Sequence, residues 1–305
     1  MKNNVFRLIS RTQKFRNFFS SFQMREREMS ICFRPGYERA FGTYPLTGED
    51  LRRAFAVAYH VGYRSFDTAQ MYGNEADLGE AIRHAKVATS DLLVTTKVHP
   101  DNYGEDRFIH SVETSLEALG MSQVNLLLLH WPDPSGENKN ALRLLRDAKR
   151  KGLASEIGVS NFTSGMMKEA QSLLEGEVAI NQVEFHPLLD QSILLEASYQ
   201  CGVPLSSFCS VARGEVFRYP EFERIGKSYG KTAAQVALRW ILQKGVAINT
   251  MSTKPENMRS NFDVMDFTLT SVDMRLIDAL NKTNFRCVDK QKVPWAPQWD
   301  GPSPS

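Results

Sequence analysis

The chain has 305 residues, of which 42% are hydrophobic and 24% are charged, and its formal net charge is +2. These values are ordinary for a soluble globular protein with a large core, and the length suits one α/β barrel or two average domains. No run approaches the ~18 apolar residues of a membrane span, and the small net charge does not favour a polyanionic partner. We therefore expect neither a membrane nor a nucleic-acid partner.

The N-terminus is the one strongly basic part of the sequence. Residues 1–25 hold six basic and no acidic side chains, so the remainder is net acidic. The segment is rich in Arg and Ser, as transit peptides are, and lacks the apolar run of a secretory signal. We expect residues 1–30 to be a disordered extension, either a tail or sequence upstream of a start at Met24 or Met29. The expected location is cytoplasmic, or organellar if residues 1–25 are a transit peptide.

From residue 39 onward, short apolar runs alternate with amphipathic helical patterns. Helices are expected over 48–62, 106–120 and 232–245, where apolar side chains recur at helical spacing up to a glycine. The expected strands lie near 39–43, 63–67, 92–97, 124–130, 156–160, 179–184, 204–208 and 246–250.

Eight strands alternating with helices predict an α/β fold, a single-domain (β/α)8 TIM barrel over residues 31–305. An open doubly wound sheet is the alternative, but the Gly-rich phosphate turn usual after its first strand is missing. After Thr283 the helical pattern fails, so we expect an irregular C-terminal tail.

The four cysteines are Cys32, Cys201, Cys209 and Cys287. They are too few and too scattered for a disulfide framework or a CxxC metal site. We expect reduced thiols, and because no His/Cys cluster has metal-ligand spacing, we expect no metal.

Three consecutive expected strands end in a residue that can ionise, namely Asp67, Lys97 and His130. Barrel enzymes place their chemistry at the C-terminal ends of the strands. Because side chains alternate along a strand, each of these residues shares a face with the residues two and four positions earlier. These sets are Tyr63 and Ser65, Leu93 and Thr95, and Leu126 and Leu128.

Each residue taken singly has an ordinary structural explanation. Asp67 could cap the following helix, although Asn74 is better placed to do so. Lys97 could extend to solvent, and His130 could be a core histidine. Three such residues at one barrel end are hard to reach by chance, so the pattern favours a chemical role.

The three residues and the nearby Tyr72 form a group suited to proton donation. A phenol has a pKa of about 10, and a neighbouring ammonium lowers it. Lys97 can supply that charge, Asp67 can hold Lys97, and His130 can hydrogen-bond an incoming carbonyl oxygen. Such a group suits protonation of a carbonyl oxygen that becomes an alkoxide. The hydride must then come from a cofactor.

Five segments, "GYRSFDTAQMYGNE", "LLVTTK", "VNLLLLHWP", "EIGVSNF" and "INQVEFHP", resemble the aldo-keto reductase superfamily in order and spacing. The likeness covers roughly residues 40–300. It is greatest to the bacterial branch that includes the 2,5-diketo-D-gluconate reductases, which the C-terminal "APQWD" also resembles.

The resemblance implies a role for each matched residue. Tyr72 would be the general acid, tuned by Lys97 and Asp67, and His130 would orient the substrate. The nicotinamide of NADP(H) would contact Ser160, Asn161, Gln182 and Phe208. The adenosine phosphate would lie near the eighth strand, beside Ser252, Lys254, Asn257 and Asn261.

The phosphate segment departs from the family pattern. Thr250 and Met251 stand where Pro and a cation are usual, and Asn257 stands where Arg is usual. A 2′-phosphate binds best to Arg or Lys. Lys254, helped by Arg259, could supply the positive charge. Both could equally be solvated residues at a helix start. We expect NADPH to be preferred over NADH by a smaller margin than is usual in the family.

The rim residues bear on the substrate. Tyr44 and Trp131 are expected to line the pocket mouth, although either could be ordinary rim packing. His99 stands where many relatives carry Trp. The segment before Gly42 lacks the usual Gly-rich lead-in and hairpin, so the barrel start is unusual.

The sequence therefore predicts a monomeric, NADP(H)-dependent reductase that converts carbonyls of small aldehydes, ketoaldehydes or keto sugars to alcohols. One alternative is a non-catalytic cofactor-binding or regulatory protein on the same barrel. Another is an inactive relative with a damaged barrel start.

Overall fold

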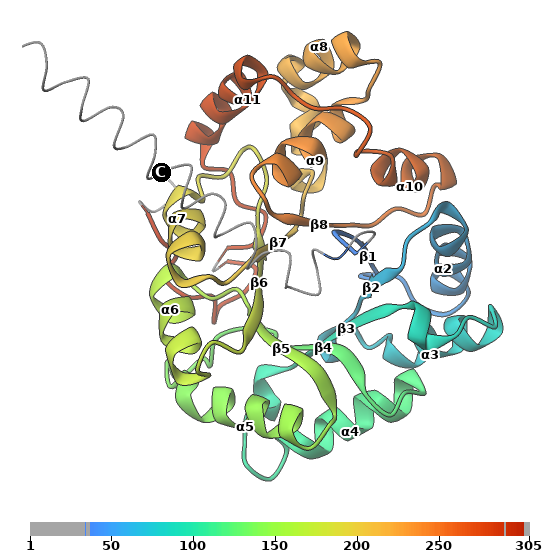
Figure 1. Cartoon of the computed structure of the whole chain (residues 1–305), viewed down its shortest axis with the longest axis vertical. Helices are drawn as coiled ribbons and strands as arrows, with labels where there is room; N and C mark the ends of the chain where they lie inside the picture. The colour runs from blue at the N-terminus through green and yellow to red at the C-terminus, as the bar shows by residue number, and fades with distance from the viewer. Residues whose placement is uncertain (1–33, 35–36, 290, 302–305) are drawn as a thin grey trace, which may run out of the picture.

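The computed structural model describes residue 34 and the ranges 37–289 and 291–301. Eight parallel strands close into a barrel in sequence order, with β8 paired to β1 (Figure 1). They are β1 (Arg39–Gly42), β2 (Ser65–Asp67), β3 (Leu93–Val98), β4 (Val124–Leu129), β5 (Ala154–Ser160), β6 (Val178–Glu184), β7 (Leu205–Phe208) and β8 (Ala247–Thr250). The predicted (β/α)8 TIM barrel is confirmed, and the open-sheet alternative is wrong. The predicted extension over residues 1–30 lies outside the described residues.

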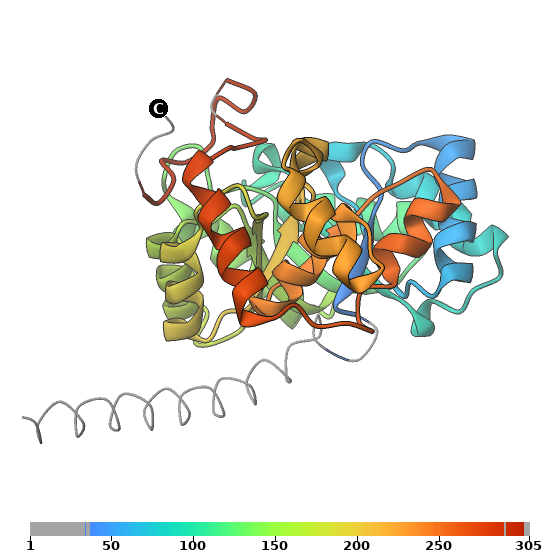
Figure 2. The ribbon, with the colours of Figure 1, turned by 90° about the horizontal axis from the view of Figure 1, so that it is seen from above.

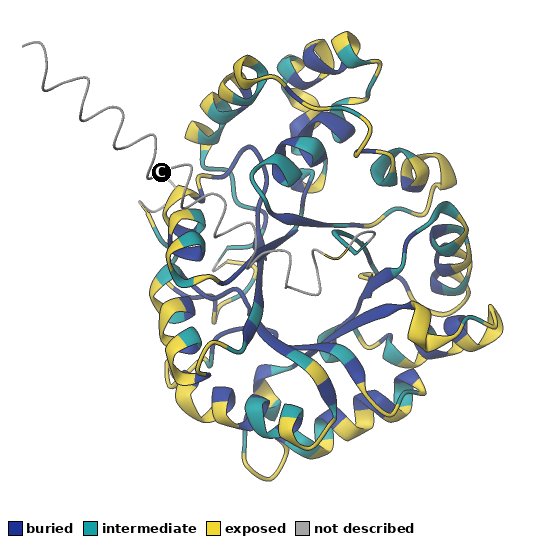
Figure 3. Cartoon of the chain, viewed as in Figure 1, coloured by how far each residue is buried: buried dark blue, intermediate teal, exposed yellow. Residues whose placement is uncertain are grey.

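Helices surround the barrel and cover its outer face (Figure 1). The strands are almost wholly buried, whereas each helix buries the side that faces the strands (Figure 3). The helices expected over 48–62, 106–120 and 232–245 are α2, α4 and α9. The α-helices are α2 (Gly48–Val61), α3 (Glu75–His84), α4 (Phe108–Leu119), α5 (Asn138–Arg150), α6 (Ser164–Leu173), α7 (Ser192–Cys201), α8 (Pro220–Tyr229), α9 (Ala233–Gln243), α10 (Pro255–Phe262) and α11 (Ser271–Asp278).

Two layers of apolar side chains hold the barrel together. The larger lies between strands and helices, and the smaller consists of Leu93, Leu126, Leu128, Ile180 and Ala247. The smaller cluster holds the alternate residues of β3 and β4 that precede Lys97 and His130, so the predicted alternation holds on these strands.

Tyr63 departs from the predicted alternation. It belongs to the larger layer, where its hydroxyl lies 3.1 Å from Thr250 Oγ1. The reason is that β2 begins only at Ser65, so the regular alternation that places Ser65 and Asp67 together does not extend back to Tyr63.

The start of the barrel is closed despite its unusual sequence. Ala40 is paired with Ser65 of β2 on one side and with Asn249 of β8 on the other. A Cβ atom on Gly42 would lie 2.9 Å from Asn249 Oδ1, so a larger residue here would require the Asn249 side chain to shift. The alternative of a damaged barrel start is not supported, because β1 is paired on both sides within the described residues.

Asn74 does not cap α3 in the way the sequence predicts. It occupies the N-cap position, but its side chain makes no capping hydrogen bond. Its amide instead donates to the Leu46 carbonyl at 2.7 Å and accepts from Thr68 Oγ1 at 2.7 Å. Asn74 therefore ties the loop after β1 to the loop after β2, which carries Tyr72.

The C-terminal segment is irregular after the short helix η6 (Ala279–Thr283), as predicted, and runs over one end of the barrel (Figure 2). Glu184 at the end of β6 accepts the backbone N–H groups of Cys287 and Val288, at 2.5 and 3.0 Å. Asp300 accepts the backbone N–H of Ser164 at 2.7 Å. We call residues 284–301 the C-terminal tail. No described helix is long and apolar enough to cross a membrane.

Candidate functional site

Asp67, Tyr72, Lys97 and His130, which we call the polar tetrad, meet at the C-terminal end of the barrel. Asp67 is the last residue of β2, Lys97 lies one residue before the end of β3, and His130 follows β4. Tyr72 ends the short helix η2 (Gln70–Tyr72) in the loop after β2. Neighbouring parallel strands thus bring together residues that are far apart in the sequence.

Lys97 is the centre of the polar tetrad. Its ammonium donates to Asp67 Oδ1 at 2.5 Å, to the Thr68 carbonyl at 2.9 Å and to the Tyr72 hydroxyl at 3.3 Å. Burial disfavours the ammonium, but the charges of Asp67 and Tyr72 outweigh it, so the pKa of Lys97 lies above its ordinary value. Lys97 is therefore a fixed, buried positive charge beside the phenol.

The pKa of Tyr72 moves in the direction opposite to the one that the sequence predicted. Burial disfavours the phenolate and raises the pKa, and the charge of Lys97 opposes this rise without cancelling it. The prediction of a lowered pKa is wrong because it weighed the neighbouring charge and left out desolvation. Tyr72 is thus a neutral phenol at pH 7, the form that can donate a proton.

His130 lies against Tyr72 with the two rings edge to face, 5.5 Å apart between centroids. Burial, followed by the charges of Lys97 and His99, lowers the pKa of His130 well below its ordinary value. The imidazole is therefore neutral. Its Nδ1 is buried and has no hydrogen-bond partner among the described residues.

Three of the predicted carboxamide contacts adjoin the polar tetrad. Gln182 Nε2 donates to Asp67 Oδ2 at 2.8 Å, and Ser160 Oγ donates to the Gln182 carbonyl at 2.8 Å. Asn161 Nδ2 donates to the His130 carbonyl at 3.0 Å. Asn161 Oδ1 is buried and has no partner in the described part of the chain, so it can accept an N–H from a bound group.

The other predicted cofactor residues do not touch the polar tetrad. Phe208 ends β7 and is half-buried. Ser252 and Lys254 lie between the end of β8 and α10, and Asn257 and Asn261 lie within α10. Ser252 Oγ accepts the backbone N–H of Lys254 at 3.1 Å. Lys254 and Asn257 are exposed, as is Met251. This second group forms an open surface in which the described residues supply few cations.

The two predicted rim residues differ in their surroundings. Tyr44 is 56% exposed, and its ring lies 5.1 Å from that of Tyr72. Trp131 is buried, with its ring 6.2 Å from that of Trp299 in the C-terminal tail. Tyr44 is therefore at the open side of the site, whereas the tail covers Trp131.

A cluster of Glu184, His186 and Cys287 was missed by the sequence reasoning. Their potential ligand atoms all lie within 4.8 Å of one another, although no His/Cys cluster with ligand spacing was expected. His186 Nε2 lies 2.9 Å from Glu184 Oε1. Because Cys287 reaches this place only through the tail, no local spacing could have revealed the cluster. The hydrogen bonds of Glu184 account for its burial.

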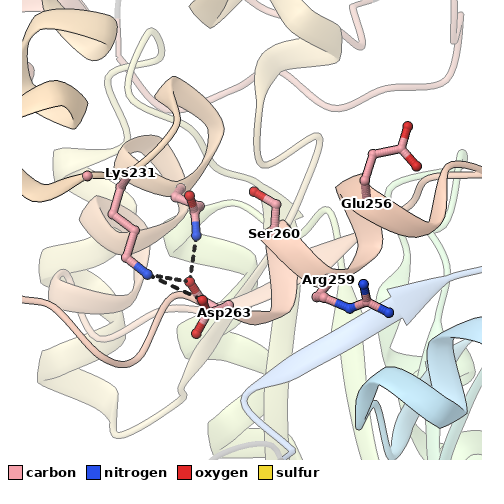
Figure 4. A pocket seen from close by; sticks show the side chains of 7 residues that line it. Lys231, Glu256, Arg259, Ser260 and Asp263 are labelled. Atoms are coloured by element: carbon pink, nitrogen blue, oxygen red, sulfur yellow. Dashed lines mark hydrogen bonds and ion pairs between the residues drawn. The ribbon is translucent and has the colours of Figure 1, made fainter.

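A separate pocket of about 330 Å³ lies beside α10 (Figure 4), and no residue of the polar tetrad lines it. Arg259, offered by the sequence as a helper for phosphate, lines this pocket. Lys231 forms ion pairs there with Asp263 and Asp266, at 3.3 and 2.7 Å. Lys231 is thus neutralised by acidic neighbours, whereas Glu256 and Arg259, which also line the pocket, form no ion pair among the described residues. The lining residues of the pocket are Gly230, Lys231, Gln235, Glu256, Arg259, Ser260 and Asp263.

Comparison with known protein families gives a match to the aldo/keto reductase family over residues 39–282. The chain belongs to this family. This aldo/keto reductase is 40% identical over 241 residues to Aldo-keto reductase Rv2971 of Mycobacterium tuberculosis (strain ATCC 25618 / H37Rv). The matched region covers 79% of this chain and 86% of the relative. It is 36% identical over 262 residues to Methylglyoxal reductase DkgB of Yersinia pestis, covering 85% and 97% of the two chains.

A solved structure also resembles this aldo/keto reductase closely. It is a crystal structure provisionally assigned as 2,5-diketo-D-gluconic acid reductase B, with a TM-score of 0.83 and 38% identity. The match covers 90% of this chain and 99% of the other. The protein is thus an oxidoreductase of a family that uses nicotinamide cofactors.

Proposed function

We propose that this aldo/keto reductase reduces the carbonyl group of small aldehydes, ketoaldehydes or keto sugars to an alcohol, with NADP(H) as the hydride carrier. The observation that carries the proposal is the chain of contacts in the polar tetrad. A phenol lies 3.3 Å from an ammonium that is itself 2.5 Å from a carboxylate. The names of the relatives, methylglyoxal reductase and diketogluconic acid reductase, support the substrate classes.

In this proposal Tyr72 donates the proton to the carbonyl oxygen. Lys97 stabilises the phenolate that remains, and Asp67 keeps Lys97 in place. His130, neutral at pH 7, hydrogen-bonds the carbonyl oxygen and so fixes the substrate. The bound cofactor supplies the hydride. The reaction needs no other ionisable group from the chain.

The residues beside the polar tetrad fit a nicotinamide carboxamide. The NH2 of such a group needs acceptors, and Asn161 Oδ1 is a buried acceptor without a partner. Ser160 and Gln182 lie next to Asn161, and Ser160 Oγ donates to the Gln182 carbonyl at 2.8 Å. Phe208 would supply the ring that stacks on the nicotinamide.

The adenosine phosphate would contact Ser252, Lys254, Asn257 and Asn261. Lys254 is the cation of this group. Met251 stands where the family usually has a cation, and its side chain is 42% exposed. We therefore expect NADPH to bind more tightly than NADH, by a small margin. Fluorescence quenching will measure both dissociation constants, and tighter binding of NADH would contradict this cofactor choice.

Substitution of Tyr72 by Phe tests the reaction. Loss of a general acid lowers turnover by about 10²–10⁴-fold, whereas NADPH binding should change little. NADPH oxidation with methylglyoxal measures turnover. Tyr199→Phe is the matched control, because it also removes one phenolic hydroxyl, hydrogen-bonded to the Lys244 carbonyl at 2.9 Å and remote from the polar tetrad.

Wild-type turnover in Tyr72→Phe would show that the assigned acid is wrong. If the wild-type protein binds NADPH but reduces none of a panel of aldehydes, ketoaldehydes and keto sugars, the non-catalytic alternative replaces the proposal. We further propose that the protein is a cytoplasmic monomer, which mass measurement in solution and fractionation will check.

A further inference from the structure

Two buried N–H donors in the C-terminal tail have no acceptor. Arg286 Nη1 and Trp299 Nε1 are both buried, and neither has a hydrogen-bond partner among the described residues. The two side chains are in contact, because the Arg286 guanidinium carbon lies 4.4 Å from the centroid of the Trp299 ring. Buried polar groups are normally hydrogen-bonded. Two such donors side by side therefore indicate a place for a ligand that accepts hydrogen bonds.

This pair of donors is linked to the polar tetrad by a line of ring contacts. The Trp299 ring lies 6.2 Å from that of Trp131, which directly follows His130 in the sequence. The His130 ring in turn lies 5.5 Å from that of Tyr72. The guanidinium is thus held at the end of the barrel that the tail covers (Figure 2), on the same side as the proton donor.

The charge of Arg286 is not neutralised by the acids around it. Burial lowers the pKa of Arg286, and the charges of Glu184 and Asp300 only partly offset this effect. Asp300 accepts the backbone N–H and the hydroxyl of Ser164, at 2.7 and 2.8 Å. Glu184 accepts two backbone N–H groups of the tail and pairs with His186. In the described part of the chain, no carboxylate forms an ion pair with Arg286. A guanidinium stays ionised at pH 7, so its charge is left for an anion.

We propose that Arg286 and Trp299 bind a carboxylate of the substrate, so that this reductase prefers carbonyl compounds that also carry a carboxylate, such as semialdehydes of dicarboxylic acids and keto sugar acids. An ionised carboxylate only accepts hydrogen bonds, and the planar guanidinium matches its geometry. The Trp299 ring holds the guanidinium by a cation–π contact and adds a neutral donor. The choice of substrate rests on the proposed function, whereas the binding of a carboxylate does not.

Matched pairs of acid and amide substrates test the proposal. 4-Carboxybenzaldehyde is anionic at pH 7, and 4-formylbenzamide has nearly the same shape without the charge. Succinate semialdehyde and its amide form a shorter pair. NADPH oxidation by the full chain gives kcat/KM for each compound. In Arg286→Met the ratio of acid to amide should fall about tenfold to a hundredfold for at least one pair, because the variant loses a charged hydrogen bond.

Trp299→Phe removes the indole donor and keeps an aromatic ring beside Arg286. Its ratio of acid to amide should fall by a smaller factor, about twofold to tenfold, because the lost donor is neutral. Arg275→Met is the matched control, since Arg275 is an exposed cation of α11. It should keep the wild-type ratio.

An unchanged ratio for both pairs in Arg286→Met would overturn the proposal, because the guanidinium would then only pack against Trp299. Each ratio compares two substrates in one protein sample. Partial misfolding of a variant lowers both rates together and cannot imitate the expected result.

Binding of terephthalate separates this proposal from the proposed function. Terephthalate has two carboxylates and no aldehyde, so calorimetry in the presence of NADPH measures its affinity without turnover. We expect Arg286→Met to bind it at least about tenfold more weakly than the wild type and Arg275→Met do. If this holds and no aldehyde is reduced, the proposed function fails and the carboxylate site stands. If aldehydes are reduced but terephthalate affinity does not depend on Arg286, the carboxylate site fails and the proposed function stands.

Discussion

At the scale of single residues, desolvation decides the charge states at the site. Burial raises the pKa of Tyr72 and lowers that of His130, and both side chains are therefore neutral at pH 7. Lys97 keeps its charge, because the carboxylate of Asp67 lies 2.5 Å from its ammonium. The result is one buried cation, Lys97, next to a neutral proton donor, Tyr72. The Lys97 charge stabilises the phenolate that forms when Tyr72 gives up its proton.

The neutral state of His130 predicts a loss of stability in acid. Its pKa is lowered in the folded protein, so below about pH 6.5 the unfolded chain binds more protons than the folded one. The free energy of unfolding therefore falls on acidification, by at most about 1.4 kcal/mol per pH unit from this group. Urea unfolding over a range of pH will measure the slope.

In His130→Asn this contribution to the slope should vanish, whatever the absolute stability of the variant. His110→Asn, at an exposed position in α4, should keep the wild-type slope. An unchanged slope in His130→Asn would mean that the folded state does not suppress the charge of His130.

At the scale of elements, the contact between α3 and α4 depends on a glycine. A Cβ atom on Gly79 would lie 2.5 Å from the Ala118 carbonyl oxygen and 2.7 Å from that of Leu119. Both are backbone atoms, so the helices themselves would have to separate. Gly79→Ala should lower the free energy of unfolding by about 1–3 kcal/mol, measured by urea unfolding.

Gly165→Ala is the matched control, because nothing lies within 4 Å of a Cβ atom at that position of α6. There the gain in helix propensity should stabilise the protein by about 0.5–1 kcal/mol. Equal effects of the two substitutions would contradict a close approach of α3 to α4.

Much of the fold could be predicted from the sequence because its strands are short, apolar and separated by amphipathic helices. The meeting of Asp67, Lys97 and His130 followed from barrel topology alone. Contacts made by the loops and the tail could not be predicted in the same way. The side chain of Asn74 bonds to residues of another loop, and Cys287 reaches Glu184 only because the tail folds back over the barrel. Such contacts leave no periodic pattern.

At the scale of the whole molecule, residues just before β1 help to close the barrel. The Ile248 N–H donates to the Glu38 carbonyl at 2.9 Å, and Tyr37 packs against the cluster of Leu93, Leu126 and Leu128. We propose that residues 31–305 are the domain. A chain that begins at Met29 should therefore keep the wild-type unfolding midpoint and turnover, measured by thermal unfolding and NADPH oxidation.

A chain that begins at Arg39 is the control, since it lacks Tyr37 and Glu38 and should unfold at a lower temperature. A lowered midpoint in the chain that begins at Met29 would place part of the domain within the first 28 residues.

The carboxylate of Asp67 has a consequence for thermodynamic linkage. One of its oxygens accepts from Lys97 and the other accepts from Gln182. A ligand that hydrogen-bonds to the Gln182 amide should weaken the bond between Gln182 and Asp67 and so change the interaction of Asp67 with the Lys97 ammonium. The proton affinity of Tyr72 should then change as well. Coupling of this kind is reciprocal. We therefore expect ligand binding at Gln182 and the ionisation of Tyr72 to be linked through this side chain, so ligand affinity should change with pH only where Tyr72 ionises, above the ordinary phenol pKa of about 10.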